Sequence, residues 1–269
     1  MHQFVRKSMV MLLAVVLSVV FVACGSNSDS KSAPAKQVEL TVSAAASLTD
    51  ALNEIQPLFE AANPNIKLVF NFGASGALQQ QIEQGAPADL FLSAATKNMK
   101  ALVEKELIDP ERQTNLLNNE LVVVVPTDGK ISVAGAADLA SDEIKKVAIG
   151  IPESVPAGNY AKEALTNAQL WDSLQPKLVQ AKDVRQVLQY VETGNAEAGF
   201  VYKTDALTSD KVGIAFSVDP STYTPVEYPI GIVKATKNAD QAGVLYDYLQ
   251  SQAALDVFVK YGFSVPAAK

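Results

Sequence analysis

Two serines, Ser47 and Ser75, occupy positions that could bind an anion. Each follows a segment predicted to be a strand and precedes a segment predicted to be a helix, in residues 44–50 (AAASLTD) and 73–76 (GASG). The first N–H groups of a helix have no partner inside the helix, and the helix dipole places about half a positive charge there. An anion is therefore a natural ligand at such a turn.

The two serines also have a simpler interpretation, in which each only caps its own helix. Two such turns in one lobe favour the anion site, because the carboxyl ends of parallel strands face the same edge of a sheet and can border one crevice. The GASG segment lacks the Lys-Ser/Thr ending of a Walker phosphate loop. The sequence thus indicates an anion crevice that is not a nucleotide loop.

Catalytic constellations are not found in the rest of the chain. The single histidine is His2, in the leader described below, and the single cysteine is Cys24, so triads built on His or Cys are excluded from the mature protein. Carboxylates and lysines such as Asp89, Glu153 and Lys203 lie in no spacing typical of a metal site or an acid/base pair. The net charge of −7 argues against nucleic-acid binding. We expect no catalytic residue, no metal ligand and no cofactor.

The elements that must position the serines follow from an alternation of strand and helix patterns, which predicts an α/β fold with largely parallel sheets. Strands are predicted at residues 39–42, 66–70, 89–92, 121–125, 147–151, 198–202, 212–216 and 226–233. Helices are predicted at residues 49–62, 77–84, 96–104, 138–139, 158–168, 183–192, 239–251 and 252–261. The pattern leaves a single sheet and two lobes both open, because it gives the class of layer and not the number of sheets.

The N-terminal segment is typical of a signal peptide, which we place at residues 1–23. It carries Arg6 and Lys7, no acid, and an apolar run that ends at Ala23 and is shorter than the roughly 20 residues needed to span a bilayer. Cys24 follows Ala23 directly and resembles the lipid-attachment cysteine of bacterial lipoproteins. The alternative is ordinary secretion with an incidental buried or free thiol. Residues 24–37 are polar and small, and predict a tether.

Six segments together resemble the molybdate-binding proteins of bacterial ABC uptake systems. They lie in collinear order along residues 38–269. The segments are 44–50 (AAASLTD), 85–94 (GAPADLFLSA), 155–165 (VPAGNYAKEAL), 183–185 (DVR), 199–202 (GFVY) and 226–229 (VEYP). The resemblance implies a two-lobed type II periplasmic-binding-protein fold, with mostly parallel sheets flanked by helices and two crossing hinge strands. On that pattern the first lobe comprises residues 38–120 and 226–269, and the second lobe residues 121–225.

The resemblance also implies five oxyanion-binding positions. Carried over position by position, these are Ser47 and Ser75 from the first lobe and Ala157, Val184 and Tyr202 from the second. The serines would donate through hydroxyl and backbone N–H, Ala157 and Val184 through backbone N–H at helix starts, and Tyr202 through its phenol. The alternative for Tyr202 is an aromatic residue packed in the core.

Some nearby residues depart from this picture or are left out of it. Ala74 and Gly76 flank Ser75 where many relatives have serines. Lys162 and Arg185 could pair with an anion, but the family site implied by the resemblance uses no cation, and both side chains can equally be solvated on helix faces. They are not assigned to the site.

The function implied by the resemblance is capture of molybdate or tungstate by a lipid-anchored monomer on the outer face of the cytoplasmic membrane. The ligand would pass to an ABC permease and, through it, to its ATPase. Two alternatives stay open: a binding protein for another tetrahedral oxyanion such as sulfate, and a secreted enzyme on a related scaffold. An enzyme would convert its ligand, whereas a binding protein would return it intact.

Overall fold

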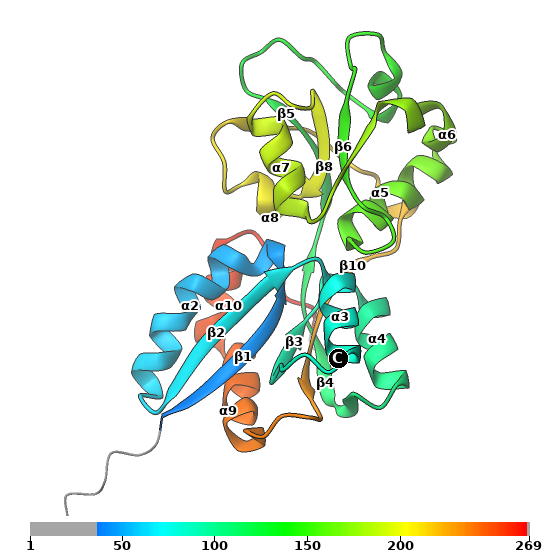
Figure 1. The fold of residues 1–269 in the computed structure, drawn as a ribbon. Helices are drawn as coiled ribbons and strands as arrows, with labels where there is room; N and C mark the ends of the chain where they lie inside the picture. Colours follow the sequence, from blue (N-terminus) through cyan, green and yellow to red (C-terminus); the bar gives the residue numbers. More distant parts are fainter. Residues whose placement is uncertain (1–36, 268–269) are drawn as a thin grey trace, which may run out of the picture. The chain divides into compact units, whose positions relative to one another are not determined.

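The structure, a computed structural model, describes residues 37–267. The predicted signal peptide, Cys24 and the tether up to residue 36 lie outside this range. The described part contains two five-stranded sheets with helices packed against them, which confirms the predicted α/β class (Figure 1). We use lobe one and lobe two for these two sheets together with their helices.

Lobe one is built from two stretches of the chain that are far apart in sequence. Its strands are β1 (Val38–Ala45), β2 (Ile66–Gly73), β3 (Leu90–Leu92), β4 (Ile108–Asn119) and β10 (Val226–Val233), in the order β2-β1-β3-β10-β4. Its helices are η1 (Ala46–Leu48), α2 (Thr49–Ala62), α3 (Ser75–Glu83), α4 (Thr96–Glu104), α9 (Ala239–Leu249) and α10 (Gln252–Lys260). Helix α3 packs beside α4, and α2 packs beside α10 (Figure 1).

Lobe two is built from the stretch between β4 and β10. Its strands are β5 (Leu121–Pro126), β6 (Val147–Gly150), β7 (Leu178–Ala181), β8 (Ala198–Tyr202) and β9 (Val212–Ser217), in the order β7-β6-β8-β5-β9. Its helices are η2 (Ala136–Ala140), α5 (Pro156–Asn167), α6 (Trp171–Leu174), η3 (Gln175–Lys177), α7 (Val184–Glu192), α8 (Lys203–Ala206) and η4 (Pro220–Thr222). Helices α5 and α7 both pack on β6 and β8.

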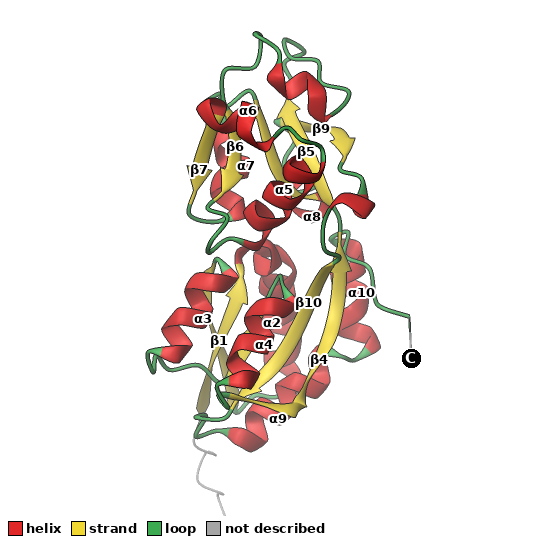
Figure 2. Cartoon of the chain, turned by 90° about the vertical axis from the view of Figure 1, so that its right-hand side faces the viewer, coloured by secondary structure: helices red, strands yellow, loops and turns green. Residues whose placement is uncertain are grey.

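Each sheet contains one strand of reversed direction. In lobe one, β10 runs antiparallel to both β3 and β4, and in lobe two, β5 runs antiparallel to both β8 and β9. The other pairs are parallel. The chain crosses from lobe one to lobe two where β4 is followed by β5, and returns between β9 and β10 (Figure 2).

Local sequence explains the elements that border the space between the lobes. Strand β5 begins with four fully buried apolar residues, as expected for a strand with a neighbour on each side and both faces covered. Helix α7 buries Val184, Val187, Leu188 and Val191, a spacing that places them on one face. Strand β10 pairs irregularly with β4 between Tyr228 and Pro229, because proline has no N–H to donate.

Two predictions of elements need correction. Strand β4 was not predicted, because its sequence IDPERQTNLLNN has a proline, several charges and no regular alternation; pairing with β10 stabilises it. The sequence also gave no sign of β7, the short strand at the edge of the second sheet. Among residues 37–267, no helix combines the length and the apolar character needed to cross a membrane.

Candidate functional site

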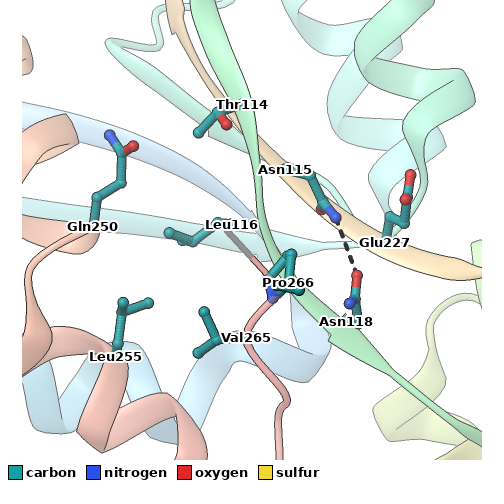
Figure 3. A pocket seen from close by; sticks show the side chains of 10 residues that line it. Thr114, Asn115, Leu116, Asn118, Glu227, Gln250, Leu255, Val265 and Pro266 are labelled. Atoms are coloured by element: carbon teal, nitrogen blue, oxygen red, sulfur yellow. Dashed lines mark hydrogen bonds between the residues drawn. The ribbon is translucent and has the colours of Figure 1, made fainter. Parts of the chain in front are cut away.

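A large open hollow of lobe one does not contain the predicted site residues. It measures about 1060 Å³ and lies between β4, β10, the helical segment around α10 and the end of the described chain (Figure 3). Its polar groups partly satisfy one another, since Asn115 donates to Asn118 at 3.0 Å. None of the five predicted positions is among its lining residues.

A second, smaller pocket of about 210 Å³ lies between the lobes and brings the five predicted positions together. Ser47, Ser75, Ala157, Val184 and Tyr202 all line it. The remaining lining residues are small or apolar apart from one carboxylate: Ala45, Ala46, Gly73, Ala74, Ala94, Val155, Pro156 and Asp183.

The two serines of lobe one are held by hydrogen bonds from behind the pocket. Ser47 lies in η1, and its Oγ is 2.8 Å from the hydroxyl of Tyr228. Ser75 is the first residue of α3, and its Oγ accepts a hydrogen bond from the backbone N–H of Ala94 at 2.9 Å. Neither serine caps a helix with its side chain, because the residues before α2 and α3 are Leu48 and Ala74. The interpretation of the serines as caps alone is therefore wrong.

The helix starts of lobe two supply backbone donors. Ala157 follows Pro156, the first residue of α5, and Val184 is the first residue of α7. Proline fits the first helical position because its missing N–H would have had no partner there. The N–H groups of Ala157 and Val184 lie in the first turn, so they have no acceptor inside their helices. Both residues line the pocket.

One oxygen of the carboxylate that lines the pocket is used to cap a helix. Asp183 caps α7, and its Oδ1 accepts the backbone N–H of Gln186 at 2.8 Å. No lysine, arginine or histidine is among the residues that line the pocket. The described lining therefore presents hydroxyl and N–H donors without a cation.

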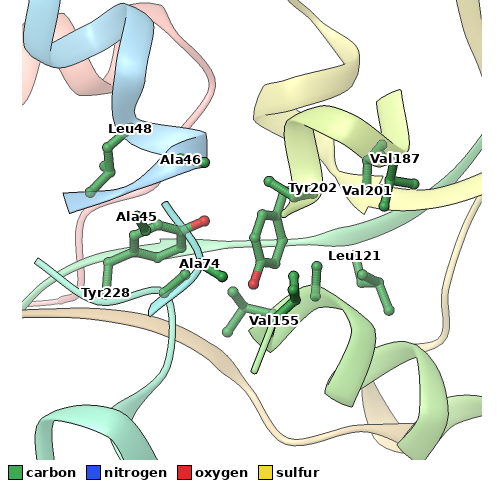
Figure 4. Packing of buried hydrophobic residues seen from close by; sticks show 14 of the residues in the cluster. Ala45, Ala46, Leu48, Ala74, Leu121, Val155, Val187, Val201, Tyr202 and Tyr228 are labelled. Atoms are coloured by element: carbon green, nitrogen blue, oxygen red, sulfur yellow. The ribbon is translucent and has the colours of Figure 1, made fainter. Parts of the chain in front are cut away.

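Tyr202 has a buried hydroxyl without a partner. It ends β8, is 1% exposed, and its Oη has no hydrogen-bond partner within the described residues. Its ring contacts that of Tyr228 edge-to-face at 5.8 Å, and its hydroxyl points toward Val155 at the start of α5 (Figure 4). Burial raises the pKa of Tyr202 well above 10, so the phenol stays protonated and remains a donor.

Direct contacts join the two lobes around this pocket. The backbone N–H of Gly76 donates to the carbonyl of Ser154 at 3.0 Å. A Cβ at position 76 would lie 2.6 Å from that carbonyl oxygen, so only glycine allows this approach. The hydroxyl of Tyr160 donates to the carbonyl of Ala94 at 3.3 Å. The departure from serine at Gly76 thus has a structural reason.

A charged cluster lies next to the pocket and corrects the expectation for Arg185. Its side chain is only 26% exposed, and its Nε lies 2.6 Å from Oδ1 of Asp205 in lobe two. Its Nη2 lies 2.5 Å from Oδ2 of Asp50 in lobe one. Desolvation raises the pKa of Asp205 to about 6, against the opposing charge of Arg185. Arg185 is an ion-pair partner between the lobes rather than a solvated side chain.

Comparison with known proteins identifies the family. A family model described as bacterial extracellular solute-binding protein matches residues 40–264. The chain belongs to this family. Its members bind solutes outside the cytoplasm, so this solute-binding protein is not an enzyme, and the enzyme alternative is excluded.

Individual relatives confirm the resemblance found in the sequence. YvgL of Bacillus subtilis, provisionally described as an ABC transporter substrate-binding lipoprotein, is 49% identical over 259 residues, 96% of this chain and 98% of its own. The molybdate-binding protein ModA of Haemophilus influenzae is 42% identical over 236 residues, 86% of this chain and 91% of its own. The solved periplasmic molybdate-binding protein of Azotobacter vinelandii shares the fold, with a TM-score of 0.76 and 24% identity over 84% of this chain and 99% of its own.

Several residues around the site were missed in the sequence. Tyr228 forms a hydrogen bond with Ser47, and Asn119 donates to Tyr228. Asp50 and Asp205 form ion pairs with Arg185. Two of them had a signal, since Asp50 ends the AAASLTD segment and Tyr228 lies in VEYP. Asn119 and Asp205 had none. Among the described residues, no cluster of His, Cys, Asp and Glu is placed to hold a metal ion.

Proposed function

We propose that this solute-binding protein captures molybdate or tungstate between its lobes and delivers it to an ABC permease and, through it, to the cytoplasmic ATPase. In this proposal Ser47, Ser75, Ala157, Val184 and Tyr202 bind the oxyanion. A lipid on Cys24 holds the monomer at the outer face of the cytoplasmic membrane. The names of the relatives that match most of the chain support the cargo, the transporter and, for YvgL, the anchor.

The observation that carries the proposal is the unpartnered hydroxyl of Tyr202. A buried polar group without a hydrogen bond costs about 1–3 kcal/mol. The Oη of Tyr202 is in that state, in a pocket that also receives the helix starts of α5 and α7. A bound oxyanion would accept a hydrogen bond from this phenol and from the helix N–H groups together, and would remove the cost.

The polarity of the pocket favours an anion that carries no proton. Near neutral pH, phosphate retains a proton that requires an acceptor, and a donor that is buried without one is costly. One oxygen of Asp183 already accepts from Gln186, and the hydroxyl of Ser75 already accepts from Ala94. Molybdate, tungstate and sulfate carry no such proton, so phosphate is the anion that this pocket should reject.

Discrimination between molybdate and sulfate must rest on size. Three of the five proposed positions, Ala157, Val184 and Ser75, lie in the first turn of a helix, where packing fixes the backbone. An anion of the wrong radius would then lose several hydrogen bonds together. The larger metal oxyanions are the proposed fit, and molybdate and tungstate should differ little from each other.

Titration calorimetry of the mature protein, residues 24–269, with molybdate, tungstate, sulfate and phosphate tests this function. We expect tight binding of molybdate and tungstate and none of phosphate. Thermal unfolding provides a second readout, because a ligand at about a thousand times its dissociation constant adds roughly 4 kcal/mol to the stability. Binding of sulfate alone would keep the fold and change the cargo. Binding of none of the four would refute the proposed function.

A further inference from the structure

We propose that Asn119 and Tyr228 are positioning residues that hold the hydroxyl hydrogen of Ser47 toward the pocket. Neither residue lines the pocket, but a chain of hydrogen bonds links both to Ser47. The proposal rests on the proposed function, in which Ser47 donates to an oxyanion. It adds a mechanism by which the direction of that hydrogen bond is set before the ligand arrives.

The first step fixes the orientation of the Asn119 side chain. Its Oδ1 accepts the backbone N–H of Glu120 at 2.9 Å, which identifies the other atom of the amide as Nδ2. This Nδ2 lies 3.2 Å from the hydroxyl of Tyr228 and 2.9 Å from the hydroxyl of Thr204. An amide NH₂ group can only donate. Asn119 therefore gives one hydrogen to each hydroxyl.

The second step sets the direction of the hydrogen bond between Tyr228 and Ser47. A tyrosine hydroxyl has one hydrogen, and that of Tyr228 already accepts from Asn119. Tyr228 is fully buried, and its other polar neighbour is Oγ of Ser47 at 2.8 Å. Donation from Tyr228 to Ser47 gives the phenol hydrogen an acceptor and leaves the Ser47 hydrogen for the pocket that Ser47 lines. The reverse direction would leave the phenol hydrogen buried without an acceptor, which is unfavourable.

The third step concerns the hydrogen of Ser47 itself. With its Oγ accepting from Tyr228, this hydrogen is free, and Ser47 lines the pocket. The hydroxyl hydrogen of Ser75 is also free, because its Oγ accepts a hydrogen bond directly from the backbone N–H of Ala94. Both serine hydroxyls are thus preset as donors toward the pocket. Preset donors need no reorganisation when the anion binds.

The position of Asn119 adds a link between the lobes. Asn119 ends β4 where the chain leaves lobe one, whereas Thr204 lies in α8 of lobe two, two residues after Tyr202. Figure 4 shows Tyr228 and Tyr202 side by side at this junction. The amide that sets the direction of the Ser47 hydroxyl therefore also holds the segment that carries Tyr202.

A double-mutant cycle tests this inference on the mature protein with molybdate as the probe. Tyr228→Phe should weaken binding about 3- to 10-fold, because the Ser47 hydroxyl loses its preset direction. In a Ser47→Ala background the same change should have less than about a twofold effect, since Tyr228 acts only through Ser47. The control is Tyr223→Phe, which also removes a buried tyrosine hydroxyl, one that accepts from the backbone N–H of Leu121 within lobe two. It should leave the affinity unchanged.

Three results would count against the positioning role of Tyr228 and Asn119. Equal losses from Tyr228→Phe with and without Ser47 would overturn the inference, because they would indicate a general packing role. An unchanged affinity of Tyr228→Phe would also overturn it. If Tyr228→Phe does not fold, Asn119→Ala is compared in the same two backgrounds with the same expectation. Wild-type protein that binds no oxyanion would instead refute the proposed function, and the inference with it.

Discussion

The two sides of the pocket reach their donor character in different ways. In lobe one, Ser47 and Ser75 each have a hydrogen-bond partner without any ligand. In lobe two, the hydroxyl of Tyr202 is buried and has no partner in the described structure. In lobe one the serine oxygens therefore have protein partners before a ligand binds, whereas in lobe two the phenol of Tyr202 has no partner until a ligand binds.

This difference separates two contributions to binding. A preset hydroxyl reduces the reorganisation that binding requires, whereas an unsatisfied hydroxyl raises the free energy of the ligand-free state in which the lobes are together. A ligand that contacts both lobes then favours the closed arrangement by its differential affinity for it. The comparison predicts opposite effects on the stability of the ligand-free protein when hydroxyls of the two lobes are removed.

The largest expected effect on binding comes from a substitution that keeps the two lobes apart. Gly76→Ala places a Cβ 2.6 Å from the carbonyl oxygen of Ser154, and separation of the lobes relieves this clash. Because the donors of lobe two then leave the anion, molybdate should bind roughly 100-fold more weakly. Calorimetry measures the affinity, and urea unfolding checks that the fold is retained. Gly135→Ala, where nothing lies within 4 Å, is the matched control. Affinity within about threefold of wild type would contradict the prediction.

The next prediction compares the hydroxyls of the two lobes directly. Tyr202→Phe and Ser75→Ala should each weaken molybdate binding by about 1–3 kcal/mol. Without ligand, Tyr202→Phe should keep or raise the free energy of unfolding, because it removes an unsatisfied group. Ser75→Ala should lower it by about 1–3 kcal/mol, because the N–H of Ala94 loses its acceptor. Urea unfolding supplies the stabilities. A lower free energy of unfolding for both variants would contradict the proposed difference between the lobes.

A pH prediction concerns Asp205, the buried carboxylate of the charged cluster. Burial raises the pKa of Asp205 from 3.8 to about 6, so between these values the folded protein binds a proton that the unfolded chain releases. The contribution of Asp205 to stability therefore falls as pH rises through this window, by up to about 1.4 kcal/mol per pH unit, and is constant above it. The stability of wild type relative to Asp205→Asn should fall accordingly in urea unfolding at pH 4, 5, 6 and 7.

The control for this pH series is an exposed carboxyl whose pKa is shifted in the opposite direction. A hydrogen bond from Lys130 lowers the pKa of Asp128. The stability of wild type relative to Asp128→Asn should therefore not fall as the pH rises. Parallel curves for wild type and Asp205→Asn across the window would show that Asp205 is ionised throughout, and that Arg185 outweighs its burial.

The smallest expected effect is at the ion pair between the lobes. Asp50→Asn removes the contact with Arg185, but the Asp50 side chain is 40% exposed. The loss in molybdate affinity should be only about 0.2–1 kcal/mol and should shrink at high salt. Glu54→Gln is the control, since Glu54 pairs with Lys260 within lobe one at 2.7 Å. A larger effect of Glu54→Gln would argue against a role of Asp50 in holding the lobes together.

Local patterns predicted the elements that carry the site. Residues 49–62, 198–202 and 226–233 form α2, β8 and β10 with the predicted bounds. These segments have strong periodicity or β-branched composition, so neighbours along the chain decide their structure. Strand β4 was missed because its pairing with β10, more than a hundred residues away, stabilises it. The five site positions came from resemblance to a family, and Ala157 and Val184 have no side-chain signal of their own.

The sequence by itself determined the α/β class and the lack of histidine and cysteine in residues 25–269, and it predicted helix starts that could bind an anion. Only the tertiary structure decided the direction of each hydroxyl, the partners of Arg185 and the need for glycine at position 76. The physical reason is that these depend on contacts between residues far apart in the chain. Ser47 and Tyr228 are 181 residues apart, and no local spacing reveals that one hydroxyl orients the other.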